Sequence, residues 1–289
     1  MIMQKIIRRF CLYTWRFWEM LGVHVVPNHF YWPIQDSKKL EAYDFDTTFP
    51  LNGIKIDIGE MKTLLESFGD YRLEYKEIHH ECGYNSNGDG SILYSMLRSI
   101  KPEKIIEVGS GYSTVVMNHA VLRNNLDDGK ECKLISVEPY PKPILRELVS
   151  ESSVTLIESK VEQVEEKLFQ QLSSGDVLFI DSSHVVDVAN DVHFLYLRIL
   201  PQLPVGVIVH IHDIRFPYEY PKEWVLKARK HWAEQYLLHM FLAFNDSFEV
   251  VFASNYLCQQ DRKLMASNLF GLSENGDGWP GSFWIRRIK

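Results

Sequence analysis

The sequence predicts an α/β protein with a Rossmann-like, doubly wound and mostly parallel seven-stranded sheet, preceded by an N-terminal extension of helices and loops. From Asp89 onward, short apolar runs alternate with amphipathic stretches, which is the pattern of βαβ units. The first apolar run ends in the turn Gly109-Ser-Gly111, where such a sheet joins its first strand to its first helix. A length of 289 residues suits one large domain with decorations.

The expected strands are short apolar runs, and the expected helices are the amphipathic stretches between them. Strands are predicted over residues 104–108, 133–137, 154–157, 177–180, 206–211, 249–252 and 283–286. Helices are predicted over residues 113–125, 143–150, 161–172, 188–200 and 222–244. The last two strands follow one another without a clear crossover helix, which favours an antiparallel edge hairpin.

The domain division expected from these patterns is an extension over residues 1–88 and a Rossmann-like domain over residues 89–289. The extension is rich in aromatic and turn residues, with one short helix over residues 60–68. Residues 1–26 alternate apolar and aromatic side chains with basic ones, and Arg16 and Glu19 interrupt the apolar run that a signal peptide needs. Such a helix can touch a membrane surface peripherally, but we expect it to pack on the domain or on a partner chain.

The bulk composition narrows the partners and the compartment. A formal net charge of -7 and a pI of about 5.9 make nucleic acid a poor partner, because phosphates repel an acidic chain. No stretch reaches the roughly 20 apolar residues of a membrane span. The four cysteines form no CxxC pair, so free thiols and a cytoplasmic location are expected. The cysteines are Cys11, Cys82, Cys132 and Cys258.

The glycine turn has the properties of a ligand-binding loop. Gly109 and Gly111 allow a tight turn and close approach of a ligand, and Ser113 or Thr114 can cap the helix that follows. A dinucleotide-binding loop is the competing interpretation, but Thr114 stands where its third glycine belongs. Glu107, two residues before the turn, suits a cationic ligand better than a pyrophosphate.

A second carboxylate, Glu138, ends the next strand, where it can accept hydrogen bonds from both hydroxyls of a ribose. The spacing Glu107-x-Gly109-x-Gly111 followed by Glu138 resembles the class I methyltransferases that use S-adenosylmethionine (SAM). The resemblance implies that the loop, with Ser110 and Ser113, holds the methionine part of SAM and that Glu138 holds its ribose. It places the adenine near Val161, after the third strand.

Two further strand ends carry the expected catalytic residues. Asp181 and His184 follow the fourth strand, and His212 and Asp213 follow the fifth. Parallel strands open at the same edge, so these side chains should gather where a methyl group is delivered. A hydroxyl acceptor must lose its proton, and a histidine can take it. His210 is expected to be packed in the core.

The pair Asp181 and His184 followed by Asp213 resembles metal-dependent O-methyltransferases that modify sugars of natural products. The resemblance implies that Asp181 and Asp213 hold Mg²⁺ or Mn²⁺ and that His184 is the base. This sequence has His212 where an acid is usual, so His212 is either a third ligand or a sign that the site lacks a metal. The sequence leaves both possibilities open.

Other segments resemble a bacterial group of methyltransferases linked to the biosynthesis of surface polysaccharides or glycolipids. The shared segments are residues 28–33, 179–185, 209–214, 232–238 and 281–284. The function expected is therefore O-methylation of a saccharide or a similarly polar metabolite, by a monomer or a homo-oligomer. Two alternatives stay open: a non-catalytic SAM-binding subunit of a biosynthetic complex, and a mononuclear iron oxygenase that uses His210, His212 and Asp213.

Overall fold

A computed structural model describes residues 2–84 and 87–289 of the chain. The chain divides into two compact units. The smaller contains residues 1–47 and 219–231, and the larger contains residues 48–218 and 232–289. The larger unit holds the sheet and all the candidate site residues, and the boundary expected after residue 88 falls inside it.

The sheet has seven strands in the order β3-β2-β1-β4-β5-β7-β6. The strands are β1 (Lys104–Val108), β2 (Lys133–Val137), β3 (Thr155–Ile157), β4 (Val177–Ile180), β5 (Ile208–Ile211), β6 (Phe248–Ala253) and β7 (Phe283–Arg287). The first five are parallel, and β7 runs antiparallel to both β5 and β6. The predicted fold class and its antiparallel edge are confirmed.

The register brings the carboxyl ends of the central strands to one edge. Val108 of β1 pairs with Val137 of β2 and with Ile180 of β4, and Ile180 pairs with Ile211 of β5. These four residues are buried, so apolar contacts on both faces fix the alignment. The polar residues that follow each strand therefore emerge side by side.

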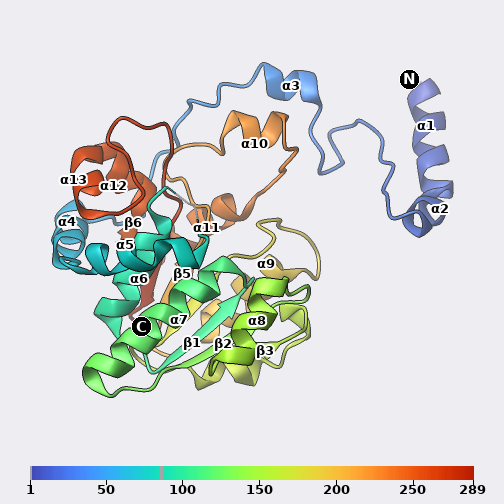
Figure 1. Cartoon of the computed structure of the whole chain (residues 1–289). Helices are drawn as coiled ribbons and strands as arrows, with labels where there is room; N and C mark the ends of the chain where they lie inside the picture. Colours follow the sequence, from blue (N-terminus) through green and yellow to red (C-terminus); the bar gives the residue numbers. More distant parts are fainter. Residues whose placement is uncertain (1, 85–86) are drawn as a thin grey trace. The chain divides into compact units, whose positions relative to one another are not determined.

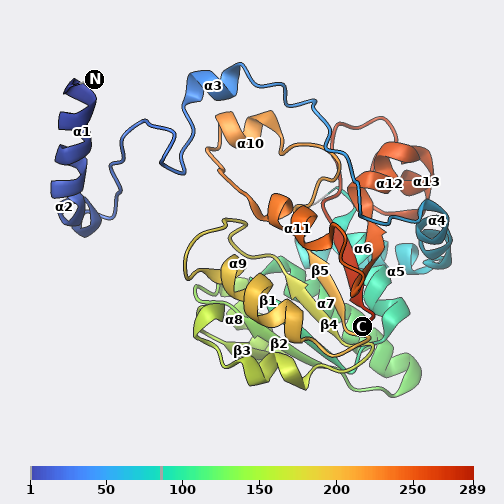
Figure 2. The same cartoon turned by 180° about the vertical axis from the view of Figure 1, so that it is seen from behind.

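Helices cover both faces of this sheet. The helices of the larger unit are α4 (Ile58–Ser67), α5 (Tyr71–Cys82), α6 (Asp89–Ile100), α7 (Tyr112–Asp128), α8 (Pro143–Glu151), α9 (Asp191–Phe194), α11 (Glu234–Leu242), α12 (Ser254–Gln260) and α13 (Arg262–Asn268). α6 and α7 lie together on the face seen in Figure 1, and α9 covers the opposite face seen in Figure 2. This two-sided cover explains why β4, at the centre of the sheet, is apolar and buried throughout.

Three predicted helices differ from the structure. Residues 161–172 form two short 3₁₀ turns, η1 (Val161–Gln163) and η2 (Glu166–Gln171), in place of an α-helix. After α9 the chain continues as a π-helical turn, η3 (Leu195–Ile199), and a 3₁₀ turn, η4 (Leu200–Gln202). The expected helix over residues 222–244 is two helices, α10 (Lys222–Leu226) and α11, which belong to different units.

The smaller unit contains α1 (Ile2–Tyr13), α2 (Trp15–Met20), α3 (Ser37–Glu41) and α10. Among the described residues, no helix is both long and apolar enough to cross a membrane. All four cysteines are free, as the sequence predicts.

Candidate active site

The loop after β1 is held against the end of β4. Gly109 has a φ of +82°, and a Cβ at this position would lie 1.8 Å from the carbonyl oxygen of Asp181. The backbone N–H of Asp181 also donates to the carbonyl of Val108 at 2.9 Å. Gly109 is therefore needed for this backbone contact, whereas the sequence suggested a contact with the ligand. The contact fixes Asp181 beside the loop.

Glu107 stabilises the loop from inside the protein. Its side chain is fully buried and accepts hydrogen bonds from Ser113 Oγ at 2.6 Å, Thr114 Oγ1 at 2.6 Å and Ser136 Oγ at 2.8 Å. Burial raises its pKa to about 7, although the hydroxyl donors favour the charged form. The expected direct contact between Glu107 and a cationic ligand does not fit this burial. Glu107 positions the loop instead.

The start of α7 completes this arrangement. Thr114 Oγ1 also accepts the N–H of Gly111 at 3.0 Å, so one hydroxyl links the loop, the helix and Glu107. The hydroxyl of Thr114 therefore satisfies a backbone N–H at the start of α7, which is the capping role predicted for Ser113 or Thr114. The N-cap residue itself is Gly111. A Cβ on Gly111 would meet no atom of the chain within 4 Å, so open space adjoins the loop there.

A cavity of about 560 Å³ lies along the ends of β1 to β4. Its volume is within the range of small-molecule sites. Its lining includes Gly109 from the loop, Glu138 after β2, Val161 after β3, and Asp181 and Ser183 after β4. The residues predicted to contact three different parts of SAM thus border one cavity. SAM fits this site by the chemistry of its lining.

Glu138 is bound by the loop that it faces. Oε2 of Glu138 accepts the N–H of Ser110 at 3.1 Å, and Oε1 accepts the N–H of Tyr140 at 2.7 Å. Each carboxylate oxygen keeps room for a second donor such as a ribose hydroxyl. The carboxylate therefore holds the shape of the loop and keeps acceptor sites for the ribose hydroxyls that the sequence predicts there.

We expect Glu138→Ala to weaken SAM binding about ten-fold or more. A hydrogen bond to a charged group contributes roughly 1.5–3 kcal/mol, and this carboxylate serves both the loop and the ligand. Isothermal titration calorimetry with SAM measures the effect. Glu147→Ala on the exposed side of α8 is the matched control. An unchanged dissociation constant for Glu138→Ala would remove the ribose role.

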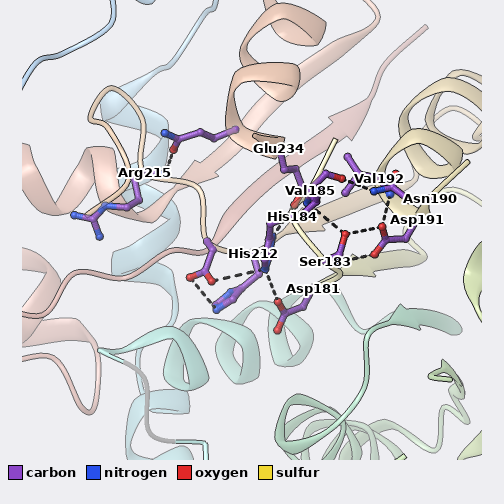
Figure 3. Close-up of polar contacts among 12 residues, drawn as sticks. Asp181, Ser183, His184, Val185, Asn190, Asp191, Val192, His212, Arg215 and Glu234 are labelled. Atoms are coloured by element: carbon purple, nitrogen blue, oxygen red, sulfur yellow. Dashed lines mark hydrogen bonds and ion pairs between the residues drawn. The ribbon is translucent and has the colours of Figure 1, made fainter. Parts of the chain in front are cut away.

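His184 lies between three carboxylates and contacts Asp181, which lines the cavity (Figure 3). Its Nδ1 is 2.7 Å from Glu234 Oε2, and its Nε2 is 3.3 Å from Asp181 Oδ1 and 3.7 Å from Asp213 Oδ2. The His184 side chain is 5% exposed and that of Asp181 is 29% exposed. The imidazole is thus oriented by a buried carboxylate on one nitrogen, and its other nitrogen faces the accessible side.

The ionisable side chains of this cluster shift one another's pKa values. Burial alone would lower the pKa of His184, but hydrogen bonds and charge from Asp181 and Glu234 raise it to about 10. Burial alone would raise the pKa of Asp181, but His212 and His184 lower it to about 2. At neutral pH the cluster therefore holds an imidazolium beside an ionised carboxylate.

The backbone of this cluster is also unusual. His184 and Asp213 have φ values of +59° and +57°, in the left-handed region that most residues avoid. The carbonyl of His184 accepts the N–H groups of Ala233 and Glu234 at 2.9 and 3.1 Å, at the start of α11. Strained backbone with such external support is common at functional sites.

His212 lies at the far side of the same cluster. Its Nε2 is 3.7 Å from Asp213 Oδ1, and the negative charges of Asp181, Asp213 and Asp89 raise its pKa against the effect of burial.

His210 is packed as predicted: it is buried, its ring stacks on Phe179 at 4.0 Å, and its Nε2 is 2.9 Å from Ser282 Oγ.

Sequence reasoning missed three residues of the cluster. Glu234 lies fifty residues after His184 and is fully buried. The ring of Trp232 lies 4.3 Å from that of His184. Asp89 is buried near His212 and accepts the N–H groups of Gly281 and Ser282 at 3.0 Å. An acid at the first turn of an apolar helix is the one signal that could have indicated Glu234.

The predicted metal ligands do not form a metal site in this arrangement. Within residues 2–84 and 87–289, no group of three or more His, Cys, Asp or Glu side chains is placed to hold a metal ion. Nε2 of His184 lies between the carboxylates of Asp181 and Asp213, where a shared ion would have to bind. In this arrangement the imidazole takes that position, and a metal ion held by Asp181, His212 and Asp213 stays a prediction.

The central part of the chain matches a known family of domains. Residues 106–214 match a family model described as a methyltransferase domain. An uncharacterized protein of Archaeoglobus fulgidus is 26% identical over 166 residues, which cover 52% of this chain and 74% of that protein. The O-methyltransferase TomG of Streptomyces achromogenes, solved with SAM, has a TM-score of 0.41 and 12% identity, with 82% of this chain and 92% of TomG covered. A CmcI structure with Mg and SAM has a TM-score of 0.38 and 14% identity, with 71% and 73% covered.

The family match spans β1 to the loop after β5, the part that contains the cavity and most of the cluster. The prediction of a SAM-dependent methyltransferase is confirmed at this level, and the Rossmann-like fold is confirmed by the sheet order. The resemblance to the polysaccharide-linked bacterial group stays a prediction.

Proposed function

We propose that this methyltransferase modifies a hydroxyl group of a saccharide or a similarly polar metabolite, with His184 as the general base. The observation that carries the proposal is His184, held by Glu234 and by Asp181, whose carboxylate lines the cofactor cavity. A histidine fixed by a carboxylate on one nitrogen is the arrangement that removes a proton from a weakly acidic hydroxyl. Several carboxylates around it also suit an acceptor rich in hydroxyl donors.

The proposed step moves one proton and one methyl group. SAM, when bound, supplies a methyl group on a sulfonium, and the C–S bond breaks as the acceptor oxygen forms its bond to carbon. Nε2 of His184 takes the hydroxyl proton, and Glu234 holds Nδ1 throughout. Asp181 stabilises the imidazolium that results.

His184 must be neutral at Nε2 before it can accept that proton. In the ligand-free chain its pKa of about 10 keeps it protonated at neutral pH. Asp181 borders both the cavity and His184, so a cation bound in the cavity competes for its carboxylate. Like charges repel, and the pKa of His184 therefore falls when the cofactor binds. Cofactor binding thus prepares the base.

Activity should rise with pH as His184 loses its proton, and Glu234→Gln should move this rise to lower pH. A raised pKa means that the neutral form accumulates only as the pH approaches about 10 in the free enzyme. Removing the negative charge of Glu234 lowers that pKa, because one of its two main charge partners is gone. The measurement is kcat/KM against pH for the wild type and the variant.

Glu249→Gln, whose partner is Arg286 on the neighbouring strand β7, is the control and should leave the pH profile unchanged. A purely structural role for Glu234 would lower thermal stability without moving the profile. A profile of Glu234→Gln that coincides with the wild type would therefore contradict the assignment.

Transfer of tritiated methyl groups from SAM tests the function directly. The full chain is incubated with SAM and fractionated cell extract, and the labelled product is identified by its chemistry. A labelled hydroxyl of a saccharide supports the proposal, and a labelled amine, carboxylate or carbon overturns the acceptor class. Activity lost to a chelator and restored by Mg²⁺ or Mn²⁺ would support the metal hypothesis.

The alternative functions give different outcomes in the same assay. Tight SAM binding without transfer to any extract component would favour the non-catalytic subunit. The iron oxygenase would use His210 as a ligand, but His210 is packed in the core on Phe179 and Ser282. A comparison of SAM binding with 2-oxoglutarate binding separates it from the methyltransferase.

A further inference from the structure

Helix α1 presents an apolar face that the described residues of its own unit leave uncovered. Met3, Ile6, Ile7 and Phe10 follow the i, i+3, i+4, i+7 spacing of one helix face. Their exposed fractions are 74%, 61%, 49% and 57%. Isolated exposed apolar residues are ordinary, but a continuous stripe of this kind marks an interaction surface.

The other side of α1 is basic. Lys5, Arg8 and Arg9 follow one another at the same helical spacing, opposite the apolar stripe. Arg16 in α2 adds a fourth positive charge, and Glu19 is the one carboxylate before Asp36. This concentration of positive charge stands out in a chain whose net charge is -7.

Aromatic side chains continue the surface beyond α1. The exposed ones include Phe17 in α2, at 50%, and Phe30 and Tyr31 in the following loop, at 79% and 76%. Trp15 stacks on Trp32 with 6.1 Å between ring centroids, so α2 and this loop pack on each other. Tyr and Trp, which the segment after α1 holds at positions 15, 18, 31 and 32, are enriched where proteins meet the headgroup region of a bilayer.

We propose that residues 2–33 dock the enzyme on an anionic lipid surface. Apolar and aromatic side chains enter the headgroup boundary, and the basic side chains contact anionic headgroups. Charge complementarity favours lipid over a second copy of this chain, because two such basic segments repel one another. The inference is independent of the acceptor, since it rests only on the smaller unit.

Sedimentation of the full-length protein with vesicles tests the proposal. One set of vesicles is phosphatidylcholine alone, and the other contains phosphatidylserine. We expect at least ten-fold stronger binding to the phosphatidylserine set, weakened by salt, because each surface cation contributes about five-fold at low ionic strength. Two variants should each abolish the stronger binding to the phosphatidylserine vesicles: Phe10→Glu alone, and Arg8→Glu combined with Arg9→Glu.

Leu126→Glu, at an exposed apolar residue of α7, is the matched control and should bind vesicles as the wild type does. Thermal melting verifies that each variant is folded, and sedimentation velocity gives the oligomeric state. Wild-type protein that stays in the supernatant with both vesicle sets overturns the proposal. If the wild type then sediments as a dimer and Phe10→Glu as a monomer, the apolar face of α1 binds a second copy of the chain. If the wild type sediments as a monomer, this face packs on the domain. Either result agrees with the packing expected from the sequence.

Discussion

His184→Asn should bind SAM with near wild-type affinity and lose methyl transfer by about 10²–10⁴-fold, the usual size of a general-base contribution. The loss should appear in kcat, because the base acts on the acceptor proton during methyl transfer. Any change in SAM affinity should be a modest gain, because the variant removes an imidazolium that repels the cationic cofactor. Single-turnover transfer measures the chemical step, and calorimetry measures SAM binding.

Asparagine is the informative replacement for two structural reasons. The φ of His184 is +59°, a value that asparagine tolerates better than alanine. The amide can still donate to Glu234, whose fully buried carboxylate would otherwise lose the 2.7 Å contact that His184 provides. The variant therefore removes the proton acceptor with the least damage to the fold.

His80→Asn on the exposed side of α5 is the control, and its activity should match the wild type. Full methyl transfer by His184→Asn would contradict the base assignment. Asp181 would then be the next candidate, because it is ionised and partly exposed at the same place.

The fold could be predicted from the sequence because the strands are buried on both faces. β1 and β4 are nearly continuous apolar runs with polar residues after them, and their predicted bounds agree with the structure. The helix expected over residues 161–172 was wrong, although Val161, Val164, Leu168 and Leu172 follow α-helical spacing. Val161 and Val164, like Phe169 and Leu172, fit a 3₁₀ turn as well as an α-helix.

The site could be predicted only where residues follow a strand directly. Asp181, His184, Glu138 and the glycine loop were found because parallel strands open at one edge. Glu234 could not be found in this way, because its place depends on the carbonyl of His184, which accepts the first amides of α11. That tertiary contact also separates α11 from α10, where the sequence pattern alone indicated one long helix.

The charge state of the cluster was the second unpredictable feature. The sequence predicts that Asp181 and Asp213 gather near His184, and the structure adds Glu234 on Nδ1. Without Glu234 the pKa of the imidazole would lie closer to its ordinary value, and with Glu234 the imidazole stays protonated at neutral pH. In the proposed mechanism, the need for cofactor binding before catalysis therefore follows from Glu234, which only the fold reveals.

The two glycines of the cofactor loop should respond to substitution in opposite ways. At Gly109, φ is +82° and a Cβ would lie 1.8 Å from a backbone oxygen, so Gly109→Ala must displace either the loop or the end of β4. We expect that variant to lose thermal stability together with SAM binding. At Gly111, φ is 177° and a Cβ would meet nothing within 4 Å.

Gly111→Val should therefore keep the melting temperature of the wild type and lose SAM affinity by about 100-fold or more, which corresponds to roughly 2.7 kcal/mol. The valine methyl groups enter the open space beside the loop, where the methionine part of SAM is expected to lie. Gly111→Ala should give a smaller loss, because it fills less of that space. Calorimetry and thermal melting of both variants measure the two effects separately. A folded Gly111→Val protein with wild-type SAM affinity would show that the ligand does not approach this face of the loop, whereas Gly109→Ala can lose binding through the fold alone.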